Sequence, residues 1–194
     1  MENGRLHMLT ISRNQMKTRP IILVFLLMAF SCLIPMLTLS CQNGQTKDEL
    51  AKYKKIKILE ERNIEIAKKF YRFLDEQELD SCTTLFAENS KGYLGSSEES
   101  LQFVDIIPFI KSYYTAFPDY KHEIENIFAS GDYVVAKLKY TGTQTATFME
   151  IPSTGKKIKY KGIFIFKILN GQIVESWGIE DDLTMMQQLG LGLK

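Results

Sequence analysis

Residues 175–190, which read ESWGIEDDLTMMQQLG, are the stretch that decides the fold. The residues up to Ile179 are expected to be the last strand of a region in which the pattern has a period of two. Beyond this point Leu183, Met186 and Leu189 follow one another at helical spacing, and they are expected to be buried. Asp181 or Asp182 stands where a helix N-cap belongs. We therefore expect a strand that runs directly into a C-terminal helix.

The same period of two runs through the sixty residues before this stretch. The dipeptide Asn170-Gly171 is a strong signal for a two-residue hairpin turn. Gly162, inside the longest apolar run, predicts a bend or a bulge. We expect four antiparallel strands, at residues 121–128, 133–142, 157–168 and 173–179.

Helical patterns precede these strands. We expect a long helix over residues 50–75 with a break near Asn63, a short helix over 78–86, a loop over 89–97 and a third helix over 100–117. Helices first and an antiparallel meander afterwards indicate an α+β domain.

Three segments together resemble one known family. They are Phe117-Pro118-Asp119, the stretch 141–155 with its Ile151-Pro152-Ser153-Thr154-Gly155 turn, and the C-terminal motif Trp-x-x-x-Asp-x-Leu from Trp177 on. In this order and spacing they resemble the SnoaL-like polyketide cyclase (ester cyclase) family of the nuclear transport factor 2-like superfamily. The resemblance covers residues 63–190. It implies a cone, in which a curved antiparallel sheet wraps on the N-terminal helices around a small-molecule pocket.

The resemblance also implies candidate catalytic residues. Asp181 matches the aspartate that acts as general acid and base in these cyclases, in an intramolecular aldol step that needs no cofactor. Such a carboxyl group needs apolar walls that raise its pKa. An aspartate before a helix can instead be an N-cap, so both interpretations of Asp181 stay open. Gln144 stands where the family commonly has His, and it can donate a hydrogen bond but cannot transfer a proton.

Aromatic residues could form the walls of this pocket, because tyrosine and tryptophan offer an apolar body with a polar tip. The expected ligand is a small apolar or carbonyl-containing molecule. The candidate binding residues are Trp177, Tyr140, Phe164, Tyr71 and Tyr113.

Other chemistry has little support in the sequence. His122 is the only histidine after the leader, and it is expected at the surface of an edge strand. A metal site would need more ligands of this kind, so none is expected. Cys82 is expected to be a buried structural residue. With 24 Lys and Arg against 23 Asp and Glu, the chain has no basic excess for nucleic acid. The lysines of 156–161 are expected to form a solvated face.

The first forty residues resemble a secretory signal. Lys17 and Arg19 precede an apolar run over 21–40, and Cys41 follows at once. This order indicates a lipoprotein signal over residues 1–40 with lipidation of Cys41, and a membrane-anchored protein of the cell envelope. An uncleaved anchor and an ordinary signal are the alternatives. Met16 is the more natural start, which would make residues 1–15 a gene-model extension.

The expected organisation is thus a leader, a tether that begins the first helix over 41–62, and a SnoaL-like domain over 63–194. Three functions stay open for this domain. It could be a cyclase or isomerase, a ligand-binding protein without turnover, or an interaction domain that forms a homodimer. Fold alone does not decide among them.

Overall fold

The structure, a computed structural model, describes the backbone of residues 19–191 and the side chains of residues 46–191. The chain divides into two compact units, residues 1–53 and 54–194. The proposed start at Met16 and the side chain of Cys41 lie outside the described residues. Among the side chains that are described, no helix is long and apolar enough to cross a membrane.

Helix α1 (Arg19–Asp75) ends where the sequence predicts, but it has no break at Asn63 and it includes residues 42–46. Asn63 is buried, and its side-chain amide donates a hydrogen bond to the Gly131 carbonyl at 3.1 Å. Glu60, one turn earlier, accepts a hydrogen bond from the Gly131 amide at 2.9 Å. The polar Asn63 is therefore a helix residue that holds the turn at Gly131.

Three further helices follow. They are α2 (Leu79–Thr83), α3 (Phe103–Ala116) and α4 (Asp182–Leu189). Helix α4 buries Met185 and Leu189, whereas Leu183, expected to be buried, is 53% exposed. Gly190 ends the helix in the left-handed conformation, at φ +107°.

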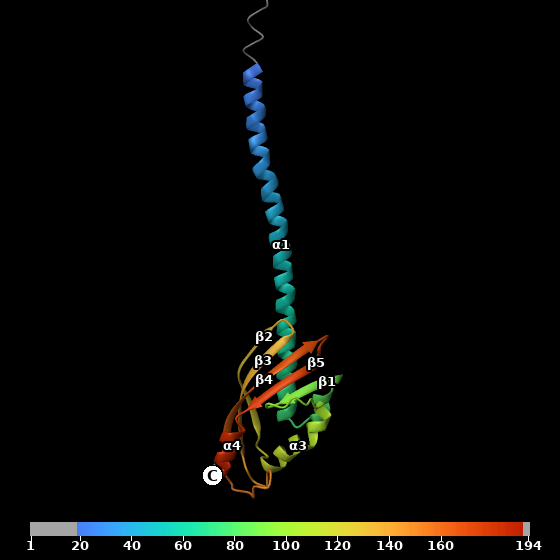
Figure 1. The fold of residues 1–194 in the computed structure, drawn as a ribbon, viewed down its shortest axis with the longest axis vertical. Helices are drawn as coiled ribbons and strands as arrows, with labels where there is room; N and C mark the ends of the chain where they lie inside the picture. Colours follow the sequence, from blue (N-terminus) through green and yellow to red (C-terminus); the bar gives the residue numbers. More distant parts are fainter. Residues whose placement is uncertain (1–18, 192–194) are drawn as a thin grey trace, which may run out of the picture. The chain divides into compact units, whose positions relative to one another are not determined.

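The five strands form one sheet in the order β1-β5-β4-β3-β2 (Figure 1). Neighbours are antiparallel except β1 and β5, which are parallel. The expected loop over 89–97 is wrong, because most of it belongs to β1. This edge strand is rich in Ser, Gly and Asn and lacks clear alternation, so only its pairing with β5 reveals it. The strands are β1 (Phe86–Leu94), β2 (Lys121–Ser130), β3 (Tyr133–Thr143), β4 (Lys157–Leu169) and β5 (Gln172–Glu180).

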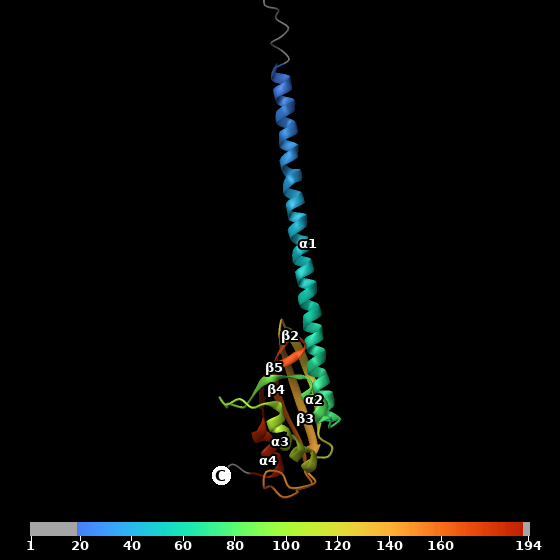
Figure 2. The same ribbon diagram turned by 90° about the vertical axis from the view of Figure 1, so that its right-hand side faces the viewer.

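The inner face of the curved sheet carries the core. Phe70 of α1 contacts Phe103 of α3 and Phe166 of β4, each edge to face. Helices α3 and α4 lie at the same end of the sheet in both ribbon views (Figures 1 and 2). The observed α+β cone confirms the predicted fold class.

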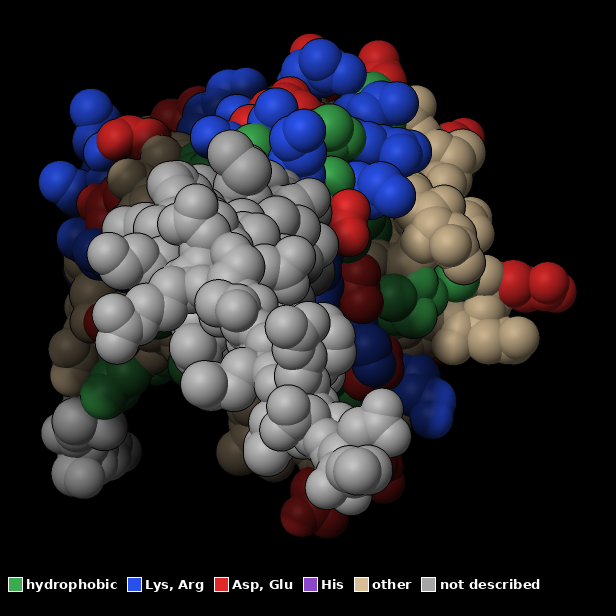
Figure 3. Space-filling view, turned by 90° about the horizontal axis from the view of Figure 1, so that it is seen from above, with side chains coloured by type: hydrophobic (Ala, Val, Ile, Leu, Met, Phe, Trp, Pro, Cys, Tyr) green, Lys and Arg blue, Asp and Glu red, His purple; other side chains and the backbone are tan. Residues whose placement is uncertain are grey.

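The outer face of the sheet carries lysine–glutamate ion pairs and, beside them, exposed apolar side chains such as Phe128, Ile163 and Ile179. Glu125 lies 3.1 Å from both Lys137 and Lys161, so one carboxylate pairs with a lysine on each of two neighbouring strands. Lys157 and Lys159 are exposed, as expected for a solvated face. Figure 3 shows the molecule from above, where basic and acidic side chains lie next to one another at this end. Exposed ion pairs of this kind contribute little stability.

Candidate functional site

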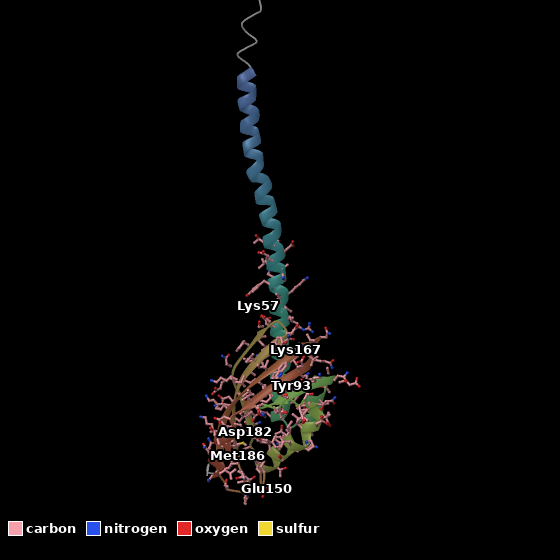
Figure 4. All side chains as sticks on the ribbon, in the orientation of Figure 1. Lys57, Tyr93, Glu150, Lys167, Asp182 and Met186 are labelled. Atoms are coloured by element: carbon pink, nitrogen blue, oxygen red, sulfur yellow. The ribbon has the colours of Figure 1, made fainter. Side chains whose placement is uncertain are left out.

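A cavity of about 280 Å³ lies between the inner face of the sheet and helices α1, α3 and α4. Its walls are mostly apolar and aromatic. Ligand pockets typically start at about 300 Å³, so the cavity suits a compact molecule. Asp182 and Met186 of α4, both labelled in Figure 4, belong to its lining. Its apolar lining includes Phe70, Leu74, Phe103, Ile106, Phe109, Ile110, Met149 and Met185.

Two glycines make room for the aromatic floor of this cavity. A Cβ on Gly178 would lie 2.3 Å from the ring of Phe164, and a Cβ on Gly162 would lie 3.0 Å from the ring of Tyr140. Gly162 therefore allows a close approach of side chains. It is not the predicted bulge, because the register shifts of β4 and its neighbours lie elsewhere, between Lys167 and Ile168.

Glu180, the last residue of β5, is the carboxyl group at this floor. Its Oε2 accepts a hydrogen bond from the Tyr160 hydroxyl at 3.3 Å. Burial is the main cause that raises the pKa of Glu180 from 4.5 to about 7, and repulsion from Asp182 adds to it. Glu180 therefore divides between its charged and neutral forms near neutral pH, as a general acid and base requires.

Tyrosine hydroxyls gather around this carboxyl group. Tyr160 also shares a hydrogen bond with Tyr120, and the rings of Tyr140 and Tyr160 stack with centroids 4.7 Å apart. Burial raises the pKa values of all three, so they stay neutral hydrogen-bond donors. The Tyr140 hydroxyl also lies beside Glu180, and its interaction with the carboxylate partly offsets the effect of burial on the pKa of Glu180.

His122 of β2 also lines the cavity, with a side chain only 9% exposed. Its Nδ1 lies 2.7 Å from Oδ1 of Asp75, the last residue of α1, and its backbone amide donates to the same oxygen at 3.0 Å. The expectation of a surface histidine is therefore wrong. The ring faces inward because the C-terminal end of α1 supplies a carboxylate partner there.

Asp181 takes the capping role that the sequence left open. Its carboxylate accepts hydrogen bonds from the Thr184 amide at 3.0 Å and from the Thr184 hydroxyl at 2.7 Å. These bonds lower the pKa of Asp181, and its side chain is exposed. It does not line the cavity. The structure thus does not place Asp181 where an acid and base would act, and Glu180, one residue earlier, occupies that position.

Gln144 is also a structural residue. It is fully buried outside the cavity lining. Its Nε2 donates to the Ile151 carbonyl at 3.1 Å, and its Oε1 accepts from the amide and the hydroxyl of Thr154 at 3.1 and 2.6 Å. These three bonds hold the loop between β3 and β4 together. The predicted role of Gln144 in polarising a substrate carbonyl therefore has no geometric support.

Four of the five predicted binding residues line the cavity, namely Tyr71, Tyr113, Tyr140 and Phe164. The fifth, Trp177, stacks against Tyr93 of β1 at a centroid distance of 5.9 Å and also contacts Tyr133. It lies on the opposite face of β5 from Gly178 and Glu180, because successive strand residues point to opposite faces. Trp177 therefore belongs to the outer face and not to the cavity.

Within residues 46–191, no group of three or more His, Cys, Asp or Glu side chains is arranged to hold a metal ion. Cys82 is buried as expected, and burial raises the pKa of its thiol to about 12, which keeps it unreactive.

The family model of the SnoaL-like polyketide cyclases matches residues 64–189. The chain belongs to this family. Among curated proteins, in contrast, none matches.

Solved structures of SnoaL-like proteins superpose on the same region. A candidate SnoaL-like polyketide cyclase from Jannaschia is 20% identical with a TM-score of 0.62, over 70% of this chain and 96% of its own. IdmH, a candidate polyketide cyclase from Streptomyces antibioticus, is 24% identical with a TM-score of 0.60, over 66% and 99%. A candidate polyketide cyclase from Bacillus cereus is 28% identical with a TM-score of 0.57, over 68% and 83%. The first two show a common fold.

Proposed function

We propose that this SnoaL-like protein binds a compact carbonyl compound in its cavity and catalyses cofactor-independent proton transfer on it, with Glu180 as the acid and base. The reaction class is an aldol-type cyclisation or an isomerisation. One observation carries the proposal: a half-buried carboxyl group, with its pKa raised to about 7, in an apolar cavity. A base with a pKa near the working pH is well matched to this task.

The chemistry needs one group that takes and then returns a proton. The Glu180 carboxylate removes a proton from the carbon next to the carbonyl group, and the C–H electron pair forms the enolate. The enolate carbon then either attacks a second carbonyl of the same molecule or is protonated at another position. In the first case protonated Glu180 gives its proton to the new alkoxide. The apolar walls support these steps by limiting water around the carboxyl group.

Two other functions were open for the domain. The cavity argues against an interaction domain filled by its own side chains. A protein that only binds its ligand needs no titratable group at the cavity floor, whereas a catalyst of proton transfer does. The protonation state of Glu180 therefore separates binding from catalysis. Gln144 carries no weight in this choice, because it does not line the cavity.

A model ketone tests the proposal without knowledge of the natural substrate. 2-Tetralone is a compact two-ring ketone with acidic C–H bonds next to its carbonyl group, and ¹H NMR follows their exchange in D₂O. We expect the full-length protein to accelerate this exchange, and Glu180→Gln to reduce the acceleration by about 10²–10⁴-fold. Asp181→Asn is the matched control, because it changes the adjacent, exposed carboxylate. Exchange at the buffer rate, or equal rates in protein and Glu180→Gln variant, contradicts the proposal.

The same proposal includes a membrane tether through lipidated Cys41, which the leader sequence supports. Stable anchoring takes more than one acyl chain, as lipoproteins have. Mass spectrometry of the N-terminal peptide from a membrane fraction tests this point. An acylated peptide that begins at Cys41 is expected, and a Cys41→Ser protein should leave the membrane. An unmodified Cys41 within a longer peptide would contradict lipidation.

A further inference from the structure

Besides the carboxyl groups of Glu180 and Asp182, the cavity lining includes the imidazole of His122. His122 lies on β2 and Glu180 on β5, with β3 and β4 between them. Their connection runs along the inner face of the sheet: His122 pairs with Tyr140, Tyr140 pairs with Tyr160, and Tyr160 donates to Glu180. Both side chains line the same cavity, so one ligand can meet both.

The Asp75 contact fixes how the imidazole is used. A carboxylate only accepts hydrogen bonds, so the 2.7 Å contact assigns the proton to Nδ1 of His122. The backbone amide of His122 donates to the same carboxylate oxygen and so fixes the position of the ring. Nε2 then remains for another partner, and it forms no hydrogen bond within residues 46–191. This arrangement resembles the way in which a carboxylate orients a general-base histidine.

The surroundings of His122 are aromatic and contain one further unused donor. The rings of Tyr71, Tyr120 and Tyr140 lie 5.6, 5.2 and 5.4 Å from the imidazole ring, measured between centroids. The hydroxyl of Tyr71 is buried, and within residues 46–191 it has no hydrogen-bond partner. Buried polar groups are nearly always paired, so unpaired ones at a cavity need an explanation. A ligand oxygen close to His122 would provide it.

We propose that the His122–Asp75 pair is a second acid–base group of the cavity, an inference that rests on the proposed function. Through Nε2, His122 binds the oxygen of a carbonyl or enol ligand. The buried hydroxyl of Tyr71, next to His122, is the additional donor for this oxygen. The ligand class is thereby narrowed to compact apolar molecules with an oxygen function at one end. The carbon acid next to this oxygen points toward Glu180.

His122 and Glu180 each return to their starting protonation state at the end of the reaction. In its charged form His122 gives the Nε2 proton to the carbonyl oxygen while the Glu180 carboxylate takes the proton from the adjacent carbon. The product is an enol, neutral His122 and neutral Glu180. When the enol carbon forms its new bond, Nε2 takes back the O–H proton and Glu180 gives its proton to the new alkoxide. His122 keeps its Nδ1 proton throughout, and Asp75 remains a carboxylate that accepts a hydrogen bond from it.

A matched pair of probes tests this role. 2-Naphthol mimics an enol, and naphthalene has the same apolar body without the oxygen. In the full-length protein we expect His122→Phe to weaken binding of 2-naphthol about tenfold, which corresponds to about 1.4 kcal/mol, and to leave naphthalene within twofold. Asp75→Asn should also weaken the binding of 2-naphthol. Asp119→Asn is its control, since Asp119 also accepts two hydrogen bonds, from Thr143, but lies outside this cavity.

NMR of the unmutated protein keeps the test independent of how the variants fold. With ¹⁵N-labelled histidine, the His122 signals are those absent from His122→Gln. These signals should show that Nδ1 carries the proton. The chemical shift of Nε2 should change when 2-naphthol is added. Three results would overturn the inference: a proton on Nε2 alone, an equal loss of affinity for both probes in His122→Phe, or no binding of 2-naphthol. If these results occur while Glu180 still catalyses exchange of 2-tetralone, the inference fails alone. A His122-dependent affinity without any exchange would mean that the proposed function fails alone.

Discussion

The pKa of Glu180 makes a prediction about stability that needs no ligand. In the unfolded chain this carboxyl group has its ordinary pKa of 4.5, and in the folded protein the pKa is about 7. Between these two values the folded protein binds the proton more tightly, so stability falls as the pH rises through this window. Below about pH 4.5 both states are protonated, and above about pH 7 the full cost of burying the charge is present.

The magnitude follows from the shift of about 2.5 units. Each unit corresponds to about 1.4 kcal/mol, so the cost at pH 8 is about 3 kcal/mol. Glu180→Gln has the shape of the neutral acid and carries no such cost. We therefore expect wild type and variant to have similar free energies of unfolding at pH 4.5. By pH 8 the variant should be more stable by about 3 kcal/mol.

Chemical denaturation at half-unit pH steps from 4.5 to 8.5 measures this difference. Asp181→Asn is the matched control, because the pKa of Asp181 is lowered from 3.8 and therefore lies below the measured range; the difference between wild type and this variant should stay constant from pH 4.5 to 8.5. Asp181 stabilises the fold above its unfolded pKa, and this contribution is lost as the pH falls through the folded pKa. A difference between wild type and Glu180→Gln that stays constant from pH 4.5 to 8.5 would refute the reasoning. It would mean that the carboxyl group is solvated in solution.

Three further predictions concern the walls of the cavity and the nearby loop. Gly178→Ala should cost about 1–3 kcal/mol of stability and reduce ligand affinity, because its Cβ would meet the Phe164 ring at 2.3 Å; unchanged denaturation and binding curves would contradict this. Gln144→Ala should cost about 1–3 kcal/mol through unpaired groups in the β3–β4 loop, with no effect on 2-tetralone exchange per folded protein, and a lost exchange rate would place Gln144 in the site. Tyr71→Phe removes a buried hydroxyl without a partner, so the ligand-free protein should keep or gain stability, and a loss above about 1 kcal/mol would reveal a missing partner.

Much of the fold follows from local patterns in the sequence. The period-two segments predict β2 to β5 within a few residues, because each strand has one buried and one exposed face. Strand β1 has no such contrast and is defined by its pairing with β5, which links residues more than eighty positions apart. Helix α1 likewise runs through residues 42–46, whose local sequence QNGQT is polar and contains a glycine.

The site could be predicted only in part. Tyr71, Tyr113, Tyr140 and Phe164 share faces with other core residues, so their patterns were informative. The choice between Asp181 and Glu180 depends on the residue at which β5 ends, and a difference of one residue moves a side chain to the other face. Parity with Gly178 would have favoured Glu180. For His122, the partner Asp75 lies 47 residues away, and no local pattern indicates that contact.

The central claim is that Glu180 is the titratable carboxyl group of the cavity, and its titration can be observed directly. ¹³C NMR of protein labelled at glutamate side-chain carboxyls, with the Glu180 signal identified by its absence from Glu180→Gln, gives the midpoint. We expect the Glu180 carboxyl group to titrate with a midpoint at about pH 7. A midpoint near the ordinary value of 4.5 would contradict it, because a carboxylate that stays charged at neutral pH could not return the proton.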